Sequence, residues 1–387
     1  MTTLRDRTGL ELRSLVHPDG TLEVTLVPTE VPPPGADEVV VRVEAAPINP
    51  SDMGVLFGPA DLASARVSGT TERPILTAKI PERALGSLAA RIGKPLPAGN
   101  EGAGVVVEAG ASAAAQALLG KTVAVFGVGG MYSQLRRVPV SACMALPDGT
   151  PAAAGASAFV NPLTALGMVE TMRLEGHRAL VHTAAASSLG QMLIRLCAKD
   201  GIGLVNIVRN ADQVALLRSL GAEHVCDSSA ASFAGDLREA IAATGATLAF
   251  DAIGGGRTAA QILNAMEAVL LREVKGYARY GSPVHKQVYL YGGLDPAPTE
   301  IARSFGMSWG VGGWLVFPFL QRVGAERTEE LKHRVGAELT TTFATSYART
   351  VSLAGALQLD VVGEYGKRST GAKVLVAPTQ PTPDRPT

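Results

Sequence analysis

The stretch HTAAASSLGQM, residues 182–192, decides the fold of this chain. It lies between a short apolar run, ALV at 179–181, and a segment whose apolar residues recur on one helical face. A turn that leads from a strand into a helix is where a G-x-G-x-x-G dinucleotide-binding loop occurs. In that register the chain has Ala185, Ser187 and Gly190, so only the third glycine is present. The stretch leaves two interpretations, a degenerate cofactor loop and a plain strand-to-helix corner.

The substitutions in this loop are compatible with cofactor binding. The first glycine of the motif permits a tight turn, the second lets the backbone approach the pyrophosphate, and the third lets the helix pack on the strand. Alanine and serine each add one small side chain and serve if their φ angles stay negative. The helix N-terminus still offers N–H groups to a phosphate. We therefore expect the cofactor to be bound by Ala185, Ser187, Ser188, Leu189 and Gly190.

The end of the next expected strand carries a basic residue. An NAD site typically has an acidic residue about 20 residues after the loop, whereas this chain has Arg209, in NIVRN. A guanidinium there can form a bidentate pair with a 2′-phosphate, which favours NADP(H). We expect Arg209 and the adjacent Asn210 to contact this phosphate. The alternative is a surface arginine that closes a strand.

Hydrophobic periodicity divides the chain in two. From about residue 156, expected strands at 179–182, 203–209, 224–227, 247–255 and 288–293 alternate with expected helices at 212–221, 232–245 and 257–271. This alternation predicts a doubly wound parallel sheet, a Rossmann domain over 156–320. Asp212 is a candidate N-cap for the helix expected at 212–221.

The remaining residues, 1–155 and 321–387, form the other expected domain. Its N-terminal part is β-rich. A helix is expected at about 325–340. The final strand, in TGAKVLV (370–376), is expected to return to the β-rich region.

Composition excludes several classes of function. The formal net charge is +0, so the chain lacks the basic balance typical of nucleic-acid partners. The most apolar run, 307–320, is shorter than the roughly 20 residues of a membrane span, so we expect core packing, a substrate channel or a dimer seam. The three cysteines form no disulfide or C-x-x-C pattern. Because no apolar segment follows the charges at the N-terminus, we expect no secretory signal and a cytoplasmic location.

Two segments lack clean periodicity. Residues 59–97 and 272–287 are expected to be long loops. Such loops in compact domains are often functional, and a solvated insertion is the alternative.

Seven stretches in this order resemble the medium-chain dehydrogenase/reductase superfamily. They are INPSD (48–52), GNEGAGVVVEAG (99–110), VNPLTALGM (160–168), LVHTAAASSLGQM (180–192), LRSLGAEHV (217–225), VYLYGG (288–293) and TGAKVLV (370–376). The resemblance implies an α/β protein with a GroES-like, β-rich substrate domain and a Rossmann domain. Within the superfamily, the chain is most similar to the zinc-independent quinone oxidoreductases and 2-enoyl thioester reductases.

The resemblance also implies site residues. Zinc members have a cysteine where this chain has Asn49, and His-Glu where it has Asn100 and Glu101, and amides do not replace thiolate and imidazole in a tetrahedral zinc site. We therefore expect no metal, and we expect reduction of an apolar small molecule with a polarised C=C bond or a quinone. Asn49 and Thr164 are the implied catalytic residues, although both also fit simple helix-start positions. The implied contacts of the last Rossmann strand are Tyr291, Gly292 and Gly293.

The proton donor stays open. Enoyl thioester reductases carry a tyrosine shortly after the NPSD turn, and this chain has none near 57–62. The candidates are Tyr132, Tyr277, Tyr280 and water. We expect His182 to orient backbone and Glu101 to anchor the GNEG turn.

Three functions compete. The first is an NADPH-dependent, zinc-free reductase of enones, quinones or enoyl thioesters, which we expect to be a homodimer. The second is an NADPH-binding sensor or interaction module with little turnover. The third is a zinc alcohol dehydrogenase with unusual ligands.

Overall fold

The computed structural model describes residues 7–127, 129–367 and 373–380. It divides into two compact units, which are described separately below. Unit 1 comprises Met1–Val160 and Val335–Thr387, and unit 2 comprises Asn161–Arg334. The sequence placed the boundaries at 155/156 and 320/321. The N-terminal residues and the start of TGAKVLV, at 370–372, lie outside the described part of the chain.

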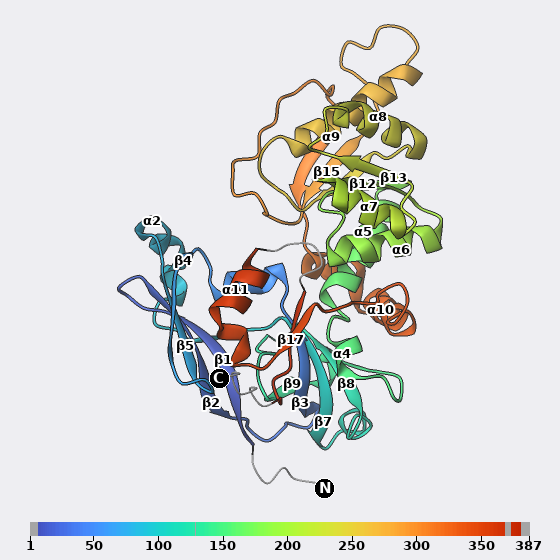
Figure 1. The fold of residues 1–387 in the computed structure, drawn as a ribbon. Coiled ribbons are helices and arrows are strands. Elements are labelled where there is room, and N and C mark those ends of the chain that lie inside the picture. Colours follow the sequence, from blue (N-terminus) through green and yellow to red (C-terminus); the bar gives the residue numbers. More distant parts are fainter. Residues whose placement is uncertain (1–6, 128, 368–372, 381–387) are drawn as a thin grey trace. The chain divides into compact units, whose positions relative to one another are not determined.

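Unit 1 is built from two sheets (Figure 1). The first has the strand order β4-β5-β2-β1-β6, and the second has β10-β8-β7-β3-β18-β17, with β9 also paired to β3. The strands of unit 1 are β1 (Thr8–Val16), β2 (Thr21–Glu30), β3 (Glu38–Pro47), β4 (Asp61–Gly69), β5 (Pro74–Lys79), β6 (Leu96–Pro97), β7 (Glu101–Ala109), β8 (Thr122–Phe126), β9 (Leu135–Pro139), β10 (Cys143–Ala145), β17 (Arg349–Val351) and β18 (Val374–Val376). Its short helices are α1 (Met53–Leu56), α2 (Glu82–Leu85), α3 (Ala113–Gln116), α4 (Ala152–Gly155) and α11 (Leu359–Gly366).

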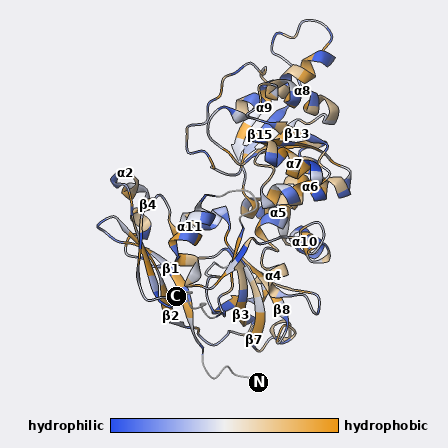
Figure 2. Cartoon of the chain, in the orientation of Figure 1, coloured by the Kyte–Doolittle hydropathy of each residue, from blue (hydrophilic) through white to orange (hydrophobic). Residues whose placement is uncertain are grey.

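The core of unit 1 joins the chain's two ends. Valines of β3, such as Val41, are buried with residues of β7 and β18, and hydrophobic colour runs along β3 and β7 in Figure 2. Strand β18 pairs antiparallel with the end of β3, where Leu375 lies opposite Pro47. Tyr365 of α11 stacks on Phe57 with ring centroids 6.2 Å apart. The expected return of the last strand to the β-rich region is therefore confirmed.

The expectation that residues 59–97 form a long loop is wrong. Strands β4 and β5 form an antiparallel hairpin that extends the first sheet beside β2. Along β4 only Ala65 is buried, because this strand lies at the sheet edge. An edge strand exposed on both faces carries little of the alternation that identifies strands in a sequence.

Unit 2 contains a fully parallel six-stranded sheet, ordered β13-β12-β11-β14-β15-β16. Its strands are β11 (Ala179–His182), β12 (Gly203–Val208), β13 (His224–Asp227), β14 (Leu248–Asp251), β15 (Lys286–Leu290) and β16 (Trp309–Gly313). The order reverses between β11 and β14. In doubly wound folds such a switch point is where ligands bind, at the carboxyl ends of the strands.

The helices of unit 2 follow the predicted alternation. They are α5 (Val160–Leu174), α6 (Ser188–Asp200), α7 (Ala211–Ser219), α8 (Phe233–Thr244), α9 (Thr258–Leu270) and α10 (Val316–Ala337). One detail of the prediction was wrong: the N-cap of α7 is Asn210, whose side chain accepts a hydrogen bond from the N–H of Gln213, and not Asp212. The helix expected at about 325–340 is confirmed as the second part of α10, which follows a break at Gly324, where φ is 83°, and ends at Ala337.

The second irregular segment, 272–287, is largely irregular up to Lys286, where β15 begins. Lys286 is fully buried and pairs with Glu267 of α9 at 2.7 Å, which ties the end of this loop to the domain. The apolar run 307–320 forms β16 and the start of α10, with Trp314 and Phe319 buried.

By length and composition, one helical stretch among the described residues, Ala152–Leu174, could span a membrane. The protein buries 78% of its most apolar window, as expected for a core helix.

Candidate functional site

The carboxyl ends of β11 and β14 are held together by buried polar side chains. Thr183 donates to Asp251 at 2.7 Å and accepts from the N–H of Ala252. The same Asp251 carboxylate accepts from the N–H of Ile253 at 2.9 Å. These bonds fix the backbone on both sides of the switch point, which is the site that the fold offers to a dinucleotide.

The loop after β11 carries its strain at Ala184. This residue has a φ of 50°, a left-handed value that no other non-glycine residue in the described part of the chain adopts. The sequence pointed to positions 185 and 187 instead, where φ is not positive. At Gly190 an added Cβ would lie 2.1 Å from the carbonyl oxygen of Ala185. The retained third glycine is therefore required for the loop to pack on helix α6.

The first turn of α6 can receive an anion. Ser187 is the N-cap, and its hydroxyl accepts from the N–H of Gly190. The N–H groups of Ser188 and Leu189 have no intrahelical acceptor, because they belong to the first turn. Together with the helix dipole, these groups fit a phosphate.

Arg209 follows β12 and is exposed. Among the described residues its guanidinium makes no hydrogen bond or ion pair, whereas its N–H donates to Gln213. The side chain of Asn210 caps α7. Arg218, a second cation on α7, donates instead to the carbonyls of Ala222 and Glu223. Of these two arginines, Arg209 is therefore the one whose guanidinium is available to bind a phosphate at this strand end.

The end of β15 places Tyr291 against His182. The His182 Nε2 lies 2.7 Å from the Tyr291 hydroxyl, so His182 contacts a side chain rather than orienting backbone as expected. Burial lowers the pKa of His182 to about 3, so the imidazole is neutral. A Cβ at Gly292 would meet the carbonyl oxygen of Ala252 at 2.6 Å, whereas Gly293 has open space. Tyr291 and Gly292 line a hollow of about 550 Å³ within unit 2, together with Trp314.

Unit 1 holds Asn49 in a buried polar network. Its Nδ2 donates to Glu101 at 2.9 Å, and its N–H donates to Asp52 at 2.8 Å. Glu101 also accepts from the N–H groups of Phe159 and Val160, at 3.1 and 2.9 Å. The GNEG turn is held by Asp52, which accepts from the N–H of Asn100. Glu101 therefore joins Asn49 to the start of α5, rather than anchoring its own turn as expected.

The Asn49 amide has a fixed orientation and one unused atom. A carboxylate only accepts, so Nδ2 must face Glu101. The opposite atom, Oδ1, is buried and has no hydrogen-bond partner among the described residues. A buried acceptor left without a donor costs free energy, which marks this oxygen as a place where a ligand would be held. Nearby, burial raises the pKa of Asp52 to about 7.

The other sequence candidates are distributed over both units. Thr164 lies buried near the start of α5, in unit 2. Tyr132 lies in the core of unit 1, and its hydroxyl donates to the Pro47 carbonyl at 3.1 Å. Tyr277 and Tyr280 are 92% and 65% exposed on the 272–287 loop. Sequence reasoning missed Ser157, Tyr347 and Lys373, which meet in unit 1 although no local motif links them.

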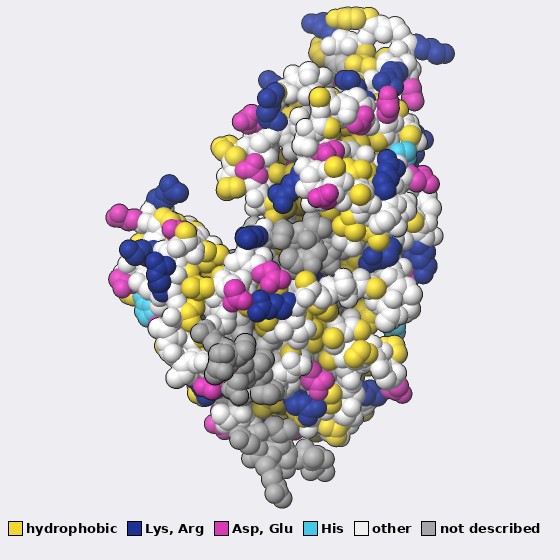
Figure 3. Space-filling model, in the orientation of Figure 1, with side chains coloured by type: hydrophobic (Ala, Val, Ile, Leu, Met, Phe, Trp, Pro, Cys, Tyr) yellow, Lys and Arg dark blue, Asp and Glu magenta, His cyan; other side chains and the backbone are white. Residues whose placement is uncertain are grey.

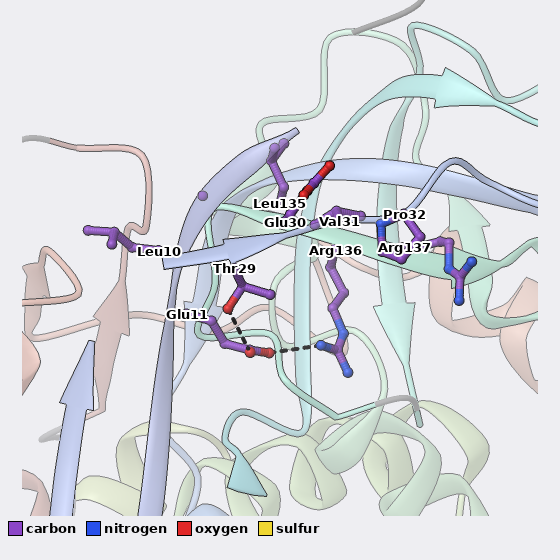
Figure 4. A pocket seen from close by; sticks show the side chains of 10 residues that line it. Leu10, Glu11, Thr29, Glu30, Val31, Pro32, Leu135, Arg136 and Arg137 are labelled. Carbon is purple, nitrogen blue, oxygen red and sulfur yellow. Dashed lines mark hydrogen bonds and ion pairs between the residues drawn. The ribbon is translucent and has the colours of Figure 1, made fainter. Parts of the chain in front are cut away.

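A second hollow, of about 210 Å³, lies on unit 1 (Figure 4). Glu11 is directed to Arg136 and Thr29 there, at 2.9 and 3.4 Å. Two of its charged groups, Glu11 and Arg136, are therefore paired with each other. No cluster of three or more His, Cys, Asp or Glu side chains suited to a metal ion occurs within residues 7–127, 129–367 and 373–380.

Comparison with protein families identifies both units. Residues 35–148 match the alcohol dehydrogenase GroES-like domain, and residues 188–268 match the family described as zinc-binding dehydrogenase. The mitochondrial enoyl-[acyl-carrier-protein] reductase of Xenopus tropicalis is 28% identical over 229 residues, which are 57% of this chain and 57% of that protein. A chloroplastic quinone-oxidoreductase homolog of Spinacia oleracea is 29% identical over 216 residues, 54% of this chain and 57% of that protein. The matches thus span somewhat more than half the length of these relatives.

Solved structures extend the likeness to nearly the whole chain. A putative NADPH:quinone reductase from Mesorhizobium loti superposes with a TM-score of 0.71 at 26% identity, covering 97% of this chain and all of that one. The Escherichia coli quinone oxidoreductase complexed with NADPH shares the fold, with a TM-score of 0.68 at 17% identity over 96% of this chain and 100% of that one. The chain therefore belongs to the medium-chain dehydrogenase/reductase superfamily, in its quinone oxidoreductase and enoyl reductase branch.

Proposed function

We propose that this oxidoreductase uses NADPH to reduce an activated C=C bond or a quinone, in an enone, a quinone or an enoyl thioester. The observation that carries the proposal is the guanidinium of Arg209 at the end of β12, which makes no hydrogen bond or ion pair with any described residue, together with the N-terminus of α6, where Gly190 lets the loop pack closely. The names of the relatives, which are quinone and enoyl reductases, support the reaction class. They do not favour a sensor module without turnover.

The residues of unit 2 fit the phosphates of NADPH. The pyrophosphate would lie against Ala185, Ser187 and the N–H groups of Ser188 and Leu189, where Gly190 keeps the loop close to the helix. Arg209 would pair with the 2′-phosphate, a contact that NADH lacks. Asn210 would contribute from the N-cap of α7 while it holds that helix in place.

The nicotinamide half would be held by other segments. Tyr291, Gly292 and Gly293 follow β15 at the carboxyl edge of the sheet. Within unit 1, the buried Oδ1 of Asn49, turned away from Glu101, is an acceptor suited to an N–H or O–H group of a ligand. We assign Asn49 and Thr164 to the reaction site because the family resemblance implies it.

We further propose that the reaction needs no zinc. The donor set fits a metal poorly, since position 49 is an amide whose Nδ2 is already bonded to Glu101. Reduction of a polarised double bond can proceed without a Lewis acid, because the acceptor's own carbonyl receives the negative charge and hydrogen-bond donors stabilise it.

In this mechanism the reduced nicotinamide, when bound, supplies a hydride to the β-carbon of the acceptor. The protein positions the acceptor, excludes water, and provides a proton for the α-carbon. Glu101 keeps the Asn49 amide in one orientation while accepting two N–H groups at the start of α5. The orientation of the Asn49 amide thus depends on the Glu101 carboxylate, which takes no part in the reaction itself.

Three partner properties complete the proposal. On the face shown in Figure 3, Lys and Arg side chains are interspersed with Asp and Glu, which suits a small-molecule substrate better than nucleic acid. Strand β16 is the edge of the six-stranded sheet and is followed by Leu315 and Phe317, which are 62% and 52% exposed. This surface is suited to a homodimer.

The three free cysteines suit a cytoplasmic protein. Light scattering on the wild type and on L315E/F317E tests the dimer, which the double variant should dissociate.

The activity is tested with NADPH and a panel of quinones, enones and enoyl thioesters, while the absorbance of the reduced cofactor is followed. Consumption of NADPH with at least one acceptor class, and slower consumption of NADH, is the expected result. Saturable NADPH binding without oxidation by any acceptor would overturn the proposal and favour a binding module.

A further inference from the structure

Three side chains from distant parts of the sequence form a hydrogen-bonded chain in unit 1. The Tyr347 hydroxyl lies 2.9 Å from Ser157 Oγ, and Lys373 Nζ donates to the same Oγ at 2.8 Å. Ser157 lies between α4 and α5, Tyr347 lies between α10 and β17, and Lys373 immediately precedes β18. Core packing alone does not require an ammonium, a hydroxyl and a phenol to be joined by consecutive hydrogen bonds.

This chain adjoins the network that holds Asn49. Ser157 is two residues before Phe159, whose N–H donates to Glu101. The charges of Glu101 and Asp52 act on Lys373, and the charge of Glu101 acts on Tyr347. The Tyr347–Ser157–Lys373 chain therefore lies within electrostatic range of the residues assigned to the reaction site in unit 1.

The hydrogen-bonding inventory fixes the donor in one of the two contacts. An ammonium has donors only, so Ser157 Oγ accepts from Lys373. Either hydroxyl can donate in the contact between Ser157 and Tyr347, and when Ser157 donates, the Tyr347 proton points away from the chain. A phenol in this position can release its proton to an acceptor while Ser157 stabilises the phenolate.

We infer that Tyr347 is the proton donor of the proposed reduction, with Ser157 and Lys373 positioning it and returning its proton. The inference rests on the proposed function. After hydride has reached the β-carbon, the O–H bond of Tyr347 breaks and a C–H bond forms at the α-carbon. The Ser157 proton moves to the phenolate, and a proton of Lys373 moves to Ser157. The neutral Lys373 amine is reprotonated from solvent, so the relay begins each turnover in the same state.

The environment of each group suits its role. Burial raises the pKa of Tyr347, so the phenol is protonated at neutral pH, and the pKa of Lys373 is lowered by burial, which eases release of its proton. Glu101 and Asp52 oppose the effect on Lys373 and keep the ammonium available. Tyr347 is only half-buried, so a reacting atom can approach this side chain.

The other tyrosines are less suitable. Tyr132 is 1% exposed and its hydroxyl is bonded to the Pro47 carbonyl. Tyr277 is 92% exposed on the 272–287 loop, and its hydroxyl makes no hydrogen bond with any described residue. The Tyr291 hydroxyl contacts His182 Nε2, but the other ring nitrogen, Nδ1, is buried without a hydrogen-bond partner among the described residues, so no further group there resupplies a proton. Tyr347 alone among these tyrosines is joined through a hydroxyl to an ammonium.

Two acceptor types make the inference testable. Reduction of an enone requires proton transfer to carbon, whereas a quinone takes its protons on oxygen, which exchanges freely with water. The experiment measures kcat and KM for one enone and one quinone, with NADPH, in the wild type and in Y347F, S157A and K373A. Y277F is the matched control for loss of a tyrosine hydroxyl.

General-acid contributions are typically 10²–10⁴-fold, so Y347F should lower kcat for the enone about 100-fold while quinone turnover and KM change little. S157A and K373A should lower enone turnover by smaller factors, and Y277F should match the wild type for both acceptors. Equal losses on both acceptors in Y347F, or unchanged enone turnover, would overturn the inference and leave the proposed function standing. If the wild type reduces quinones but not enones, the inference about Tyr347 is likewise overturned and the proposed function stands. A wild type inactive on both acceptors would overturn the proposed function and the inference with it.

Discussion

Glu101 accepts a hydrogen bond from the side-chain amide of Asn49 at 2.9 Å, although 52 residues separate the two in the sequence. The same carboxylate receives the N–H groups of Phe159 and Val160. One buried carboxylate thus fixes both the amide assigned to the site and the backbone that leads into α5.

Replacement of Glu101 by alanine should destabilise unit 1. It removes the acceptor of three N–H groups, of which those of Asn49 and Phe159 are buried and that of Val160 is partly buried. Because each buried group costs about 1–3 kcal/mol, we expect a loss of about 2 kcal/mol or more. The measurement is hydrogen-exchange mass spectrometry of peptides from β3 and β7. E101Q keeps one acceptor oxygen and should lose less. E44A removes only an exposed pair with Arg42 and serves as the control. Equal protection in E101A and E44A would contradict this role of Glu101.

Asp52 should make unit 1 less stable as the pH rises. Burial raises its pKa from 3.8 to about 7 in the folded protein. Between these values the folded state holds a proton that the unfolded state has released, so the free energy of unfolding falls with increasing pH across this window. The fall is at most about 4 kcal/mol, since each pKa unit corresponds to about 1.4 kcal/mol.

D52N removes this titration, although its amide can accept only one of the two N–H groups that Asp52 binds. Exchange of β3 and β7 amides at pH 5 and pH 8 should therefore show a smaller pH dependence in D52N than in the wild type. Identical pH dependence in the two proteins would show that Asp52 does not titrate in this range.

Arg209 should set the cofactor preference. Loss of a charge-assisted contact to the 2′-phosphate costs about 1.5–3 kcal/mol, so R209A should weaken NADPH binding about 10- to 100-fold and leave NADH binding little changed. R218A is the matched control, because Arg218 is bonded to backbone carbonyls. Titration of cofactor fluorescence gives both dissociation constants. Equal weakening of NADPH and NADH in R209A would refute the 2′-phosphate assignment.

Gly190 should tolerate no side chain. A Cβ there would lie 2.1 Å from the Ala185 carbonyl oxygen, so G190A must displace the loop. We expect a loss of about 1–3 kcal/mol, as for overpacked sites, together with loss of NADPH binding. In α8, Gly235 has nothing within 4 Å of an added Cβ, and G235A should be neutral or stabilising. Both tryptophans lie in unit 2, so their fluorescence follows its unfolding in urea. NADPH binding by G190A at wild-type affinity would contradict this reading.

Most of the fold could be predicted from the sequence because its signals are local. The apolar face of α6 and the alternation of strands with helices determine the Rossmann unit, and the single retained glycine marks the loop. The hairpin of β4 and β5 could not be predicted, because an edge strand that buries only Ala65 has almost no periodicity. The choice between Asn210 and Asp212 as N-cap depends on backbone geometry that both residues permit.

The site was harder to predict than the fold. Asn49 and Glu101 lie in recognisable turns, but their contact depends on how β3 and β7 pair. Ser157 is 190 positions from Tyr347 and 216 positions from Lys373 in the sequence. No motif with a fixed spacing could therefore have predicted that these three side chains meet. The strain at Ala184 was missed because alanine gives no sign of a positive φ.

The most direct test of the account is the fate of the transferred hydrogen. NADPH that carries deuterium at both C4 positions of the nicotinamide is incubated with the protein and an enone, and the product is analysed by NMR. The account predicts deuterium at the β-carbon and a solvent-derived hydrogen at the α-carbon. A product without deuterium at the β-carbon, or no product while NADPH stays bound and reduced, would contradict it.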